Sequence, residues 1–235
     1  MILLTKLILV HLIGDFLLQP KKWVKEKEKR KLKSPKLYIH VGIHTILAFL
    51  IVWDITYWKL IVTISILHLI IDGIKLTFQK KNTKRQWFFI DQLLHLTTIF
   101  VAFILFTKSS FSLSIFNTNT GLLLLTSLVF LTKPTSIIMQ SIFSKWNINK
   151  LTKGNESLKH AGSYIGILER ILVFIFIITN HWEAVGFLIT AKSVFRFGDL
   201  QESKQRKLTE YVLIGTLISF GIAILTGLLF NYLIN

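Results

Sequence analysis

Long apolar runs alternate with short, strongly basic segments along the chain. Runs that approach the roughly 20 residues needed to cross a bilayer as an α-helix are typical of integral membrane proteins. They cover residues 2–19, 38–57, 58–78, 87–107, 120–133, 162–180, 183–198 and 208–233. This pattern predicts an all-α, polytopic membrane protein with about eight transmembrane helices.

Polar stretches between the runs indicate the domain organisation. A stretch rich in Ser, Asn and Thr follows the fourth run, and a mixed basic region at 134–160, expected to hold an interfacial helix and a loop, follows the fifth. We therefore predict a four-helix transmembrane domain at 1–107. A second transmembrane helical region with basic loops is expected at 120–235.

The charges predict an orientation in the membrane. Of the 235 residues, 28 are Lys or Arg and 12 are Asp or Glu, which gives a net charge of +16. The segments KKWVKEKEKRKLKSPK and QKKNTKRQ, after the first and third runs, carry much of this excess. The positive-inside rule places these loops in the cytoplasm and both termini outside. Such loops favour anionic lipids as partners rather than nucleic acid.

The first run ends in HLIGDFLLQ, where polar residues recur every four positions. His11, Asp15 and Gln19 would share one face of a helix. An ionisable side chain inside a membrane-length helix is a functional-site hypothesis, because hydrocarbon strongly disfavours it. The sequence therefore predicts polar partners elsewhere in the chain.

Four pairs with the same i, i+4 spacing supply those partners. The pairs of the first and third runs lie toward the C-terminal ends, and those of the second and fourth toward the N-terminal ends. Because successive spans alternate in direction, all four pairs reach the same, cytoplasmic, side. A single histidine or pair in such a helix is often satisfied by a backbone carbonyl or an interhelical hydrogen bond. The pairs are His11/Asp15, His40/His44, His68/Asp72 and Asp91/His95.

The first half of the chain also repeats itself. HLIGDFLLQPKK at 11–22 resembles HLIIDGIKLTFQKK at 68–81, and IHVGIH at 39–44 resembles IDQLLH at 90–95. The repeat predicts a four-helix bundle built from two repeated hairpins, related by a pseudo-two-fold axis along the membrane normal.

Imidazole and carboxylate groups in this number are typical of a metal centre. The chain has no cysteine, so thiolate ligands and disulfides are excluded. Eight N/O ligands exceed the needs of one tetrahedral ion and suit two or more divalent ions, Zn²⁺ first and Mn²⁺ or Fe²⁺ as alternatives. Asp15, Asp72 and Asp91 are also candidate catalytic bases. Gln19 and Gln92 are candidates to hydrogen-bond the ligands or orient a substrate.

The second half carries its own charges within apolar runs, on the same predicted cytoplasmic side. One interpretation is snorkelling and Glu–Arg pairing that holds helices together. The other is a cationic pocket that binds the phosphate or head group of a substrate. The residues are Glu169, Arg170, Lys192, Arg196 and Glu210.

Four motifs together resemble a family of bacterial and phage membrane proteins, domain of unknown function 3307. They are HLIGDFLLQ, the HxxxH of the second run, HLIID and IDQLLH. The resemblance covers roughly residues 1–105, implies a bacterial inner (plasma) membrane and assigns no activity. At a greater distance, the repeated HxxxD pattern is similar to zinc-dependent phospholipase C, to S1/P1-type nucleases and to small membrane proteins described as metal-dependent hydrolases.

Three functions remain open at this stage. The first is a membrane-embedded, metal-dependent hydrolase that acts on a phosphoester or lipid head group at the cytoplasmic leaflet. The second is a transporter of metal ions or protons, which the repeat favours. The third is a non-enzymatic membrane protein in which the metal only holds helices together.

Overall fold

A computed structural model describes residues 2–107, 119–146, 161–197 and 203–234, without the side chains at 195–208. The described residues contain helices and turns and no strand, so the all-α prediction is confirmed. The chain divides into two compact units, residues 1–129 and 130–235. The dividing point lies at the end of a helix, α6 (Thr120–Leu131), rather than in the predicted link before residue 120.

Six described helices are long and apolar enough to cross a membrane, and the number is seven if a bent helix pair near the N-terminus counts as one span. The expected count of about eight is not confirmed, for two reasons. Residues Thr120–Phe143 form one candidate span rather than a short span and an interfacial helix. The helix α9 (Trp182–Phe197) has 16 residues, about 24 Å, against a hydrocarbon core of about 30 Å.

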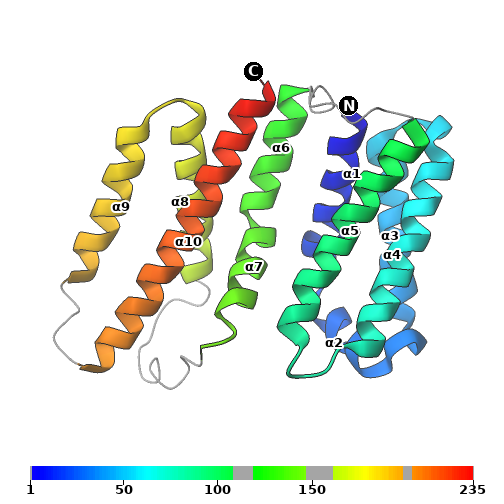
Figure 1. Ribbon diagram of the computed structural model, residues 1–235, viewed down its shortest axis with the longest axis horizontal. Helices are drawn as coiled ribbons and strands as arrows, with labels where there is room; N and C mark the ends of the chain where they lie inside the picture. The colour runs from blue at the N-terminus through cyan, green and yellow to red at the C-terminus, as the bar shows by residue number, and fades with distance from the viewer. Residues whose placement is uncertain (1, 108–118, 147–160, 198–202, 235) are drawn as a thin grey trace. The chain divides into compact units, whose positions relative to one another are not determined.

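Four helices of the first unit pack side by side (Figure 1). In this ring α1 contacts α3 and α5, and α4 also contacts α3 and α5. Two-sided contacts of this kind give each helix an inward face, on which polar groups are shielded from lipid. The helices are α1 (Ile2–Leu12), α3 (Pro35–Val52), α4 (Trp58–Phe78) and α5 (Lys84–Thr107).

An apolar core fills one half of this ring. Its residues come from the beginning of α1 and α4 and from the end of α3 and α5, so they lie at the end opposite the basic segments. Burial of these side chains supplies the main packing contacts among the four helices. The core consists of Leu3, Leu4, Leu7, Val10, Ala48, Val52, Leu60, Ile61, Ile99, Ala102 and Phe103.

The periodicity of the first apolar run predicts one regular helix up to Gln19. The structure differs from this prediction. Helix α1 passes into the π-helix η1 (Ile13–Leu17), and the chain then bends by 84° into α2 (Lys21–Arg30). Pro20 explains the end of the helix, since a proline disfavours helical geometry in the residue before it. Gln19 consequently lies in the connection and not on a helix.

The basic segment after the bend is helical rather than the loop that the sequence predicts. It forms α2 (Lys21–Arg30) and a short 3-10 turn, Lys31–Lys33. Most of its lysines are exposed, but Lys27 is buried. This segment crosses the end of the four helices in Figure 1, so it lies close to the polar half of the ring.

In the second unit, α8 (Ala161–Ile178) packs along α10 (Ser203–Ile234) and also contacts α7 (Lys133–Phe143) and α9. The buried face of α8 carries Val173, Phe174 and Ile177. Phe174 packs edge-to-face against Phe230 of α10, with ring centroids 5.6 Å apart.

Candidate metal centre

The polar half of the four-helix ring collects all eight predicted ligands. They form three groups, and within each group one ligand atom per residue lies within 4.8 Å of the others. Asp15 belongs to groups one and two, and His68 belongs to groups one and three. Group one is His11, Asp15, His44 and His68; group two is Asp15, Asp91 and His95; group three is His40, His68 and Asp72.

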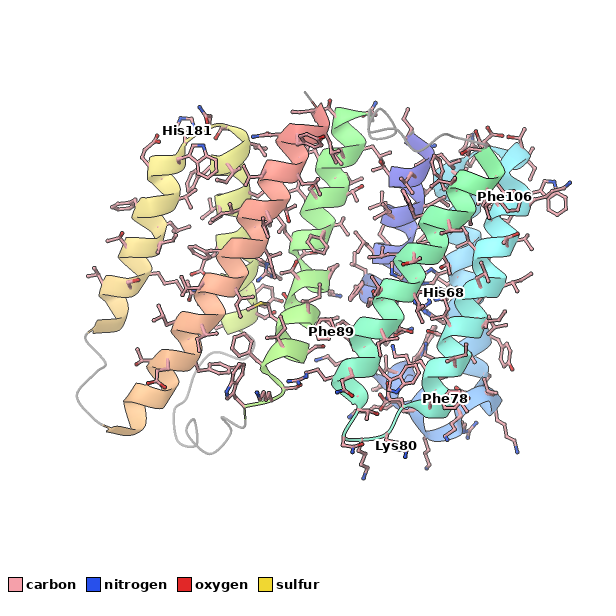
Figure 2. All side chains as sticks on the ribbon, in the orientation of Figure 1. His68, Phe78, Lys80, Phe89, Phe106 and His181 are labelled. Carbon is pink, nitrogen blue, oxygen red and sulfur yellow. The ribbon has the colours of Figure 1, made fainter. Side chains whose placement is uncertain are left out.

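The cluster lies nearer the middle of the helices than the sequence predicts. In Figure 2, His68 lies between Phe106, near one end of α5, and Lys80, in the turn that follows α4. His68 is also the central residue of α4, which spans Trp58–Phe78. The ligands therefore extend from the helix midpoints toward the basic end, instead of gathering at that end.

His68 is the centre of a group of five packed imidazole rings. Its ring centroid lies 4.0 Å from that of His95 and 4.2 Å from that of His44. The rings of His40 and His11 follow at 5.3 and 6.0 Å. Five imidazoles from four helices thus lie in one small volume. Hydrogen bonds between pairs of helices would not require such a gathering.

Asp15 reaches the middle of these rings from the π-helix. Its Oδ1 atom lies 3.0 Å from His44 Nε2, 3.2 Å from His40 Nε2 and 3.6 Å from His68 Nε2. One carboxylate oxygen therefore faces three imidazole nitrogens at once. π-Helical turns are rare and frequently occur at functional sites, and here the turn carries the carboxylate that two groups share.

Several ligand atoms in the cluster have no hydrogen-bond partner, although they are buried. Leaving a buried polar atom unpaired costs about 1–3 kcal/mol, so native proteins rarely do it without a reason. Every such side-chain atom among the described residues belongs to this cluster. The atoms are His11 Nδ1, Asp15 Oδ1, His44 Nε2, Asp91 Oδ1 and His95 Nε2. Convergent, unpaired nitrogen and oxygen atoms are the donor set that a divalent metal ion requires.

The histidine in α5 is held through one ring nitrogen, and the other is buried without a hydrogen-bond partner. His95 Nδ1 lies 2.8 Å from the backbone oxygen of Asp91. A carbonyl oxygen only accepts hydrogen bonds, so Nδ1 carries the proton and Nε2 of the neutral ring keeps its lone pair. A backbone hydrogen bond of this kind is how metal-binding histidines are commonly oriented.

Close approach of two helices at Gly14 brings Asp15 to the rings. A Cβ atom added at Gly14 would overlap the imidazole of His44. Only glycine therefore allows η1 to lie this close to α3. By contrast, a Cβ atom added at Gly42 of α3 would meet no atom within 4 Å. No close contact therefore requires glycine at this position.

Both predicted glutamines contact the cluster. Gln92 Nε2 donates to Asp15 Oδ2 at 3.0 Å and to Asp91 Oδ2 at 3.2 Å. Its Oε1 atom lies 3.2 Å from His11 Nε2, so one side chain connects three candidate ligands. Gln19 reaches back from the connection, and its Nε2 atom lies 2.9 Å from His40 Nε2.

Two lysines that sequence reasoning missed neutralise carboxylates of the cluster. Lys27 Nζ donates to Asp72 Oδ2 at 2.8 Å, and Lys75 Nζ donates to Asp91 Oδ2 at 2.7 Å. A signal existed for Lys75, since it lies within an apolar run three residues after Asp72. Nothing distinguishes Lys27 from the other lysines of its basic segment in the sequence.

In the second unit, Arg170 holds helices together. Its Nε atom donates to Leu131 O at 2.7 Å, and its terminal nitrogens donate to Thr132 O at 3.2 Å, Ser136 Oγ at 2.8 Å and Ser219 Oγ at 3.2 Å. The guanidinium thus joins α8 to the break between α6 and α7 and to α10. These contacts hold helices together through carbonyl and hydroxyl oxygens and not through the Glu–Arg pair of the first interpretation.

The other predicted charges of this unit have different surroundings. Lys192 of α9 donates to Glu169 of α8 at 2.5 Å, and its ammonium lies 5.5 Å from the centroid of the Phe220 ring. The side chain of Glu210 is exposed. Arg196 lies among the residues whose side chains are not described. The cationic pocket that these residues predict stays a prediction.

A small cavity of about 20 Å³, room for about one water molecule, lies where the cluster meets the apolar core. His11, His44 and His68 line one side of it, and core residues such as Leu7 and Ile99 line the other. The core thus closes the cluster on the side away from the basic segments.

Fold and site together define a helical membrane protein with a buried cluster of imidazoles and carboxylates. The family described as "Protein of unknown function (DUF3307)" matches residues 3–124, more than half of the chain and all eight cluster residues. The chain belongs to this family, as the sequence motifs predict. Comparison with curated proteins and with solved structures returns no match.

Proposed function

We propose that the first unit binds two divalent metal ions and acts as a membrane-embedded, metal-dependent hydrolase. The observation that carries the proposal is the distribution of the unpaired buried atoms. All five belong to groups one and two, which share Asp15. Two ions, held by the residues of groups one and two, would pair these atoms, whereas hydrogen bonds within the protein leave them unpaired.

The ligand sets differ in their chemistry. Group one offers three imidazoles and one carboxylate, and group two offers one imidazole and two carboxylates. Both sets suit Zn²⁺, with Mn²⁺ or Fe²⁺ as alternatives. Gln92 would hold the carboxylates of Asp15 and Asp91 in place through the hydrogen bonds described above.

Hydrolysis of a phosphoester is the reaction that this arrangement supports best. Divalent ions polarise phosphoryl oxygens and make water more acidic, and both effects speed hydrolysis. Asp15 and Asp91 would serve as ligands, and Asp72, outside groups one and two, pairs with Lys27. Lys75, whose side chain is 24% exposed, would supply positive charge to an anionic substrate such as a lipid head group.

Closure of the ring by the apolar core distinguishes this function from transport. Sites near the middle of the helices are common in transporters, and the depth of His68 agrees with that alternative. The apolar core fills the other half of the ring, however, and leaves a cavity of only about 20 Å³ beside the cluster. An ion or substrate would therefore enter and leave at the basic end, on the cytoplasmic side of a bacterial inner membrane rich in anionic lipid.

The repeat also supports a common origin of the two halves of the site. Alignment of the repeated segments pairs Asp15 with Asp72 and His11 with His68, and all four residues lie in the cluster. We propose two repeated hairpins, α1–α3 and α4–α5, that each contribute four of the eight ligands.

The test is elemental analysis of the purified, detergent-solubilised protein, followed by an assay with a chromogenic phosphodiester and with phospholipid vesicles. We expect two equivalents of a transition metal and hydrolysis that a chelator abolishes. The Asp54→Asn variant is the matched control, because Asp54 lies at the opposite end and only caps a turn through Thr56. A protein without stoichiometric metal would contradict the proposal. Metal uptake into vesicles without hydrolysis would favour transport.

A further inference from the structure

The third group of the cluster differs from the other two in its hydrogen bonding. None of its members, His40, His68 and Asp72, has an unpaired buried atom. The ring nitrogens of His40 and His68 lie 3.3 Å apart, and His40 Nε2 also has a partner in Gln19. Group three has the composition of a metal site, but His40 Nε2, His68 Nε2 and Asp72 Oδ2 already have partners within the protein.

A lysine from another helix pairs the carboxylate of this group. Lys27 Nζ lies 2.8 Å from Asp72 Oδ2, and the two side chains are only 6% and 7% exposed. His40 Nε2 lies 3.9 Å from the same oxygen. The ammonium group therefore occupies a position beside Asp72 at the edge of the two imidazoles, where a cation of group three would bind.

We infer that the Lys27 ammonium takes the place of a third divalent ion, so that group three is a latent metal site. The inference rests on the proposed two-ion centre, and it explains why that centre holds two ions rather than three. A cation held by a buried carboxylate repels a second cation from the same position, because the low local dielectric strengthens the repulsion. With Lys27 present, Asp72 is neutralised from within the chain.

Comparison with Lys75 shows why a lysine blocks metal binding in group three and not in group two. Lys75 binds Asp91 through Oδ2, but Asp91 Oδ1 remains without a hydrogen-bond partner. Group two therefore keeps a carboxylate oxygen for an ion. Neither oxygen of Asp72 is among the unpaired buried atoms.

The position of Lys27 makes α2 the element that sets the number of ions. Helix α2 follows the 84° bend, and its other lysines are exposed. Lys27 alone among them is directed into the cluster. Removal of this one positive charge should expose a site for Zn²⁺ held by His40 and Asp72, because His68 already belongs to group one.

The test measures bound zinc per chain by elemental analysis after equilibration with Zn²⁺ and removal of excess. We expect Lys27→Met to bind one zinc ion more than the unsubstituted protein. Lys25→Met is the matched control, since Lys25 is an exposed lysine of the same helix, and its zinc content should not change. The double variant Lys27→Met/Asp72→Asn should lose the added ion.

The outcomes separate this inference from the proposed function. If the unsubstituted protein and Lys27→Met both bind two ions, the latent site is refuted and the two-ion centre stands. If the unsubstituted protein binds three, Lys27 does not replace an ion. If neither protein binds zinc, the proposed function fails together with the inference. Should Lys27→Met not yield a monodisperse protein, Lys27→Gln, which also removes the charge, replaces it with the same expectations.

Discussion

Asp15 Oδ1 and His44 Nε2 lie 3.0 Å apart, and yet neither atom has a hydrogen-bond partner. A carboxylate and an imidazole at that distance normally pair. Here the carboxylate oxygen also faces His40 and His68, so its surroundings fit a shared cation better than any single donor. The pair is therefore the most direct place to test the metal centre.

Replacement of Asp15 by Asn should remove metal from both groups. Even the loss of residues that only orient ligands costs metal sites about 10–100-fold in affinity, and Asp15 belongs to two ligand sets. We expect at least about a 10-fold rise in the dissociation constant of each ion, measured by competition with a chromogenic chelator. Unchanged zinc affinity in a folded Asp15→Asn protein would contradict the assignment of Asp15 to both ligand sets.

Gly14→Ala should destabilise the first unit. The added methyl group overlaps the His44 ring, so η1 and α3 must separate, at a cost of about 1–3 kcal/mol. Gly42→Ala is the control on α3, because its methyl group meets no atom within 4 Å. It should leave stability unchanged or raise it by up to about 1 kcal/mol. Thermal unfolding in detergent measures both variants, and equal effects would refute the close-contact explanation.

Removal of bound metal should lower stability. A ligand that binds only the folded state at about 100 times its dissociation constant adds about 2.7 kcal/mol. Dialysis against a chelator should therefore lower the unfolding temperature, and added Zn²⁺ should restore it in a concentration-dependent manner. The Asp15→Asn protein provides the comparison, since its unfolding temperature should respond much less to zinc.

Arg170→Met should destabilise the second unit without altering metal content. The substitution leaves the carbonyl oxygens of Leu131 and Thr132 without their charged donor, and we expect a loss of about 3 kcal/mol or more. Arg170→Lys should rescue little of this, since an ammonium group cannot reproduce the planar fork of a guanidinium. A stable Arg170→Met protein that loses hydrolysis would instead indicate substrate binding.

The absence of cysteine allows the orientation to be measured directly. Asn82, in the turn between α4 and α5, is exposed, and so is Thr56, between α3 and α4. A single cysteine can be introduced at either position. A membrane-impermeant maleimide added to intact cells should label Thr56→Cys and not Asn82→Cys, because the basic turn is expected in the cytoplasm. The reverse pattern would place the metal centre at the outer face.

The repeated spacing of His and Asp was sufficient to predict which residues meet. Residues four apart share a helix face whatever the tertiary structure, so the convergence of His68 and Asp72 with pairs from other helices needed only antiparallel packing. Depth was predicted less well. Helices α3 and α5 begin nearer the basic end than their apolar runs do, at Pro35 and Lys84, whereas α4 keeps the bounds of its run, Trp58–Phe78.

Features that depend on tertiary contacts could not be predicted from periodicity. The π-helical turn at Asp15 and the bend after Gln19 reposition side chains that a regular helix would place elsewhere. Lys27 belongs to a run of similar lysines, and only the fold of α2 shows that it is buried. The contacts of Arg170 could not be predicted for the same reason, because its hydrogen-bond acceptors lie in other helices.

The apolar core has a consequence for how the site responds to an energised membrane. The core closes one end of the helix ring, and the ligands begin at the helix midpoints. An ion that reaches them from the basic end therefore crosses part of the transmembrane electric field. A full crossing changes the energy of one elementary charge by about 2.3 kcal/mol per 100 mV. With the basic end on the negative side, the membrane potential opposes entry of each divalent ion, so occupancy should rise when the membrane depolarises.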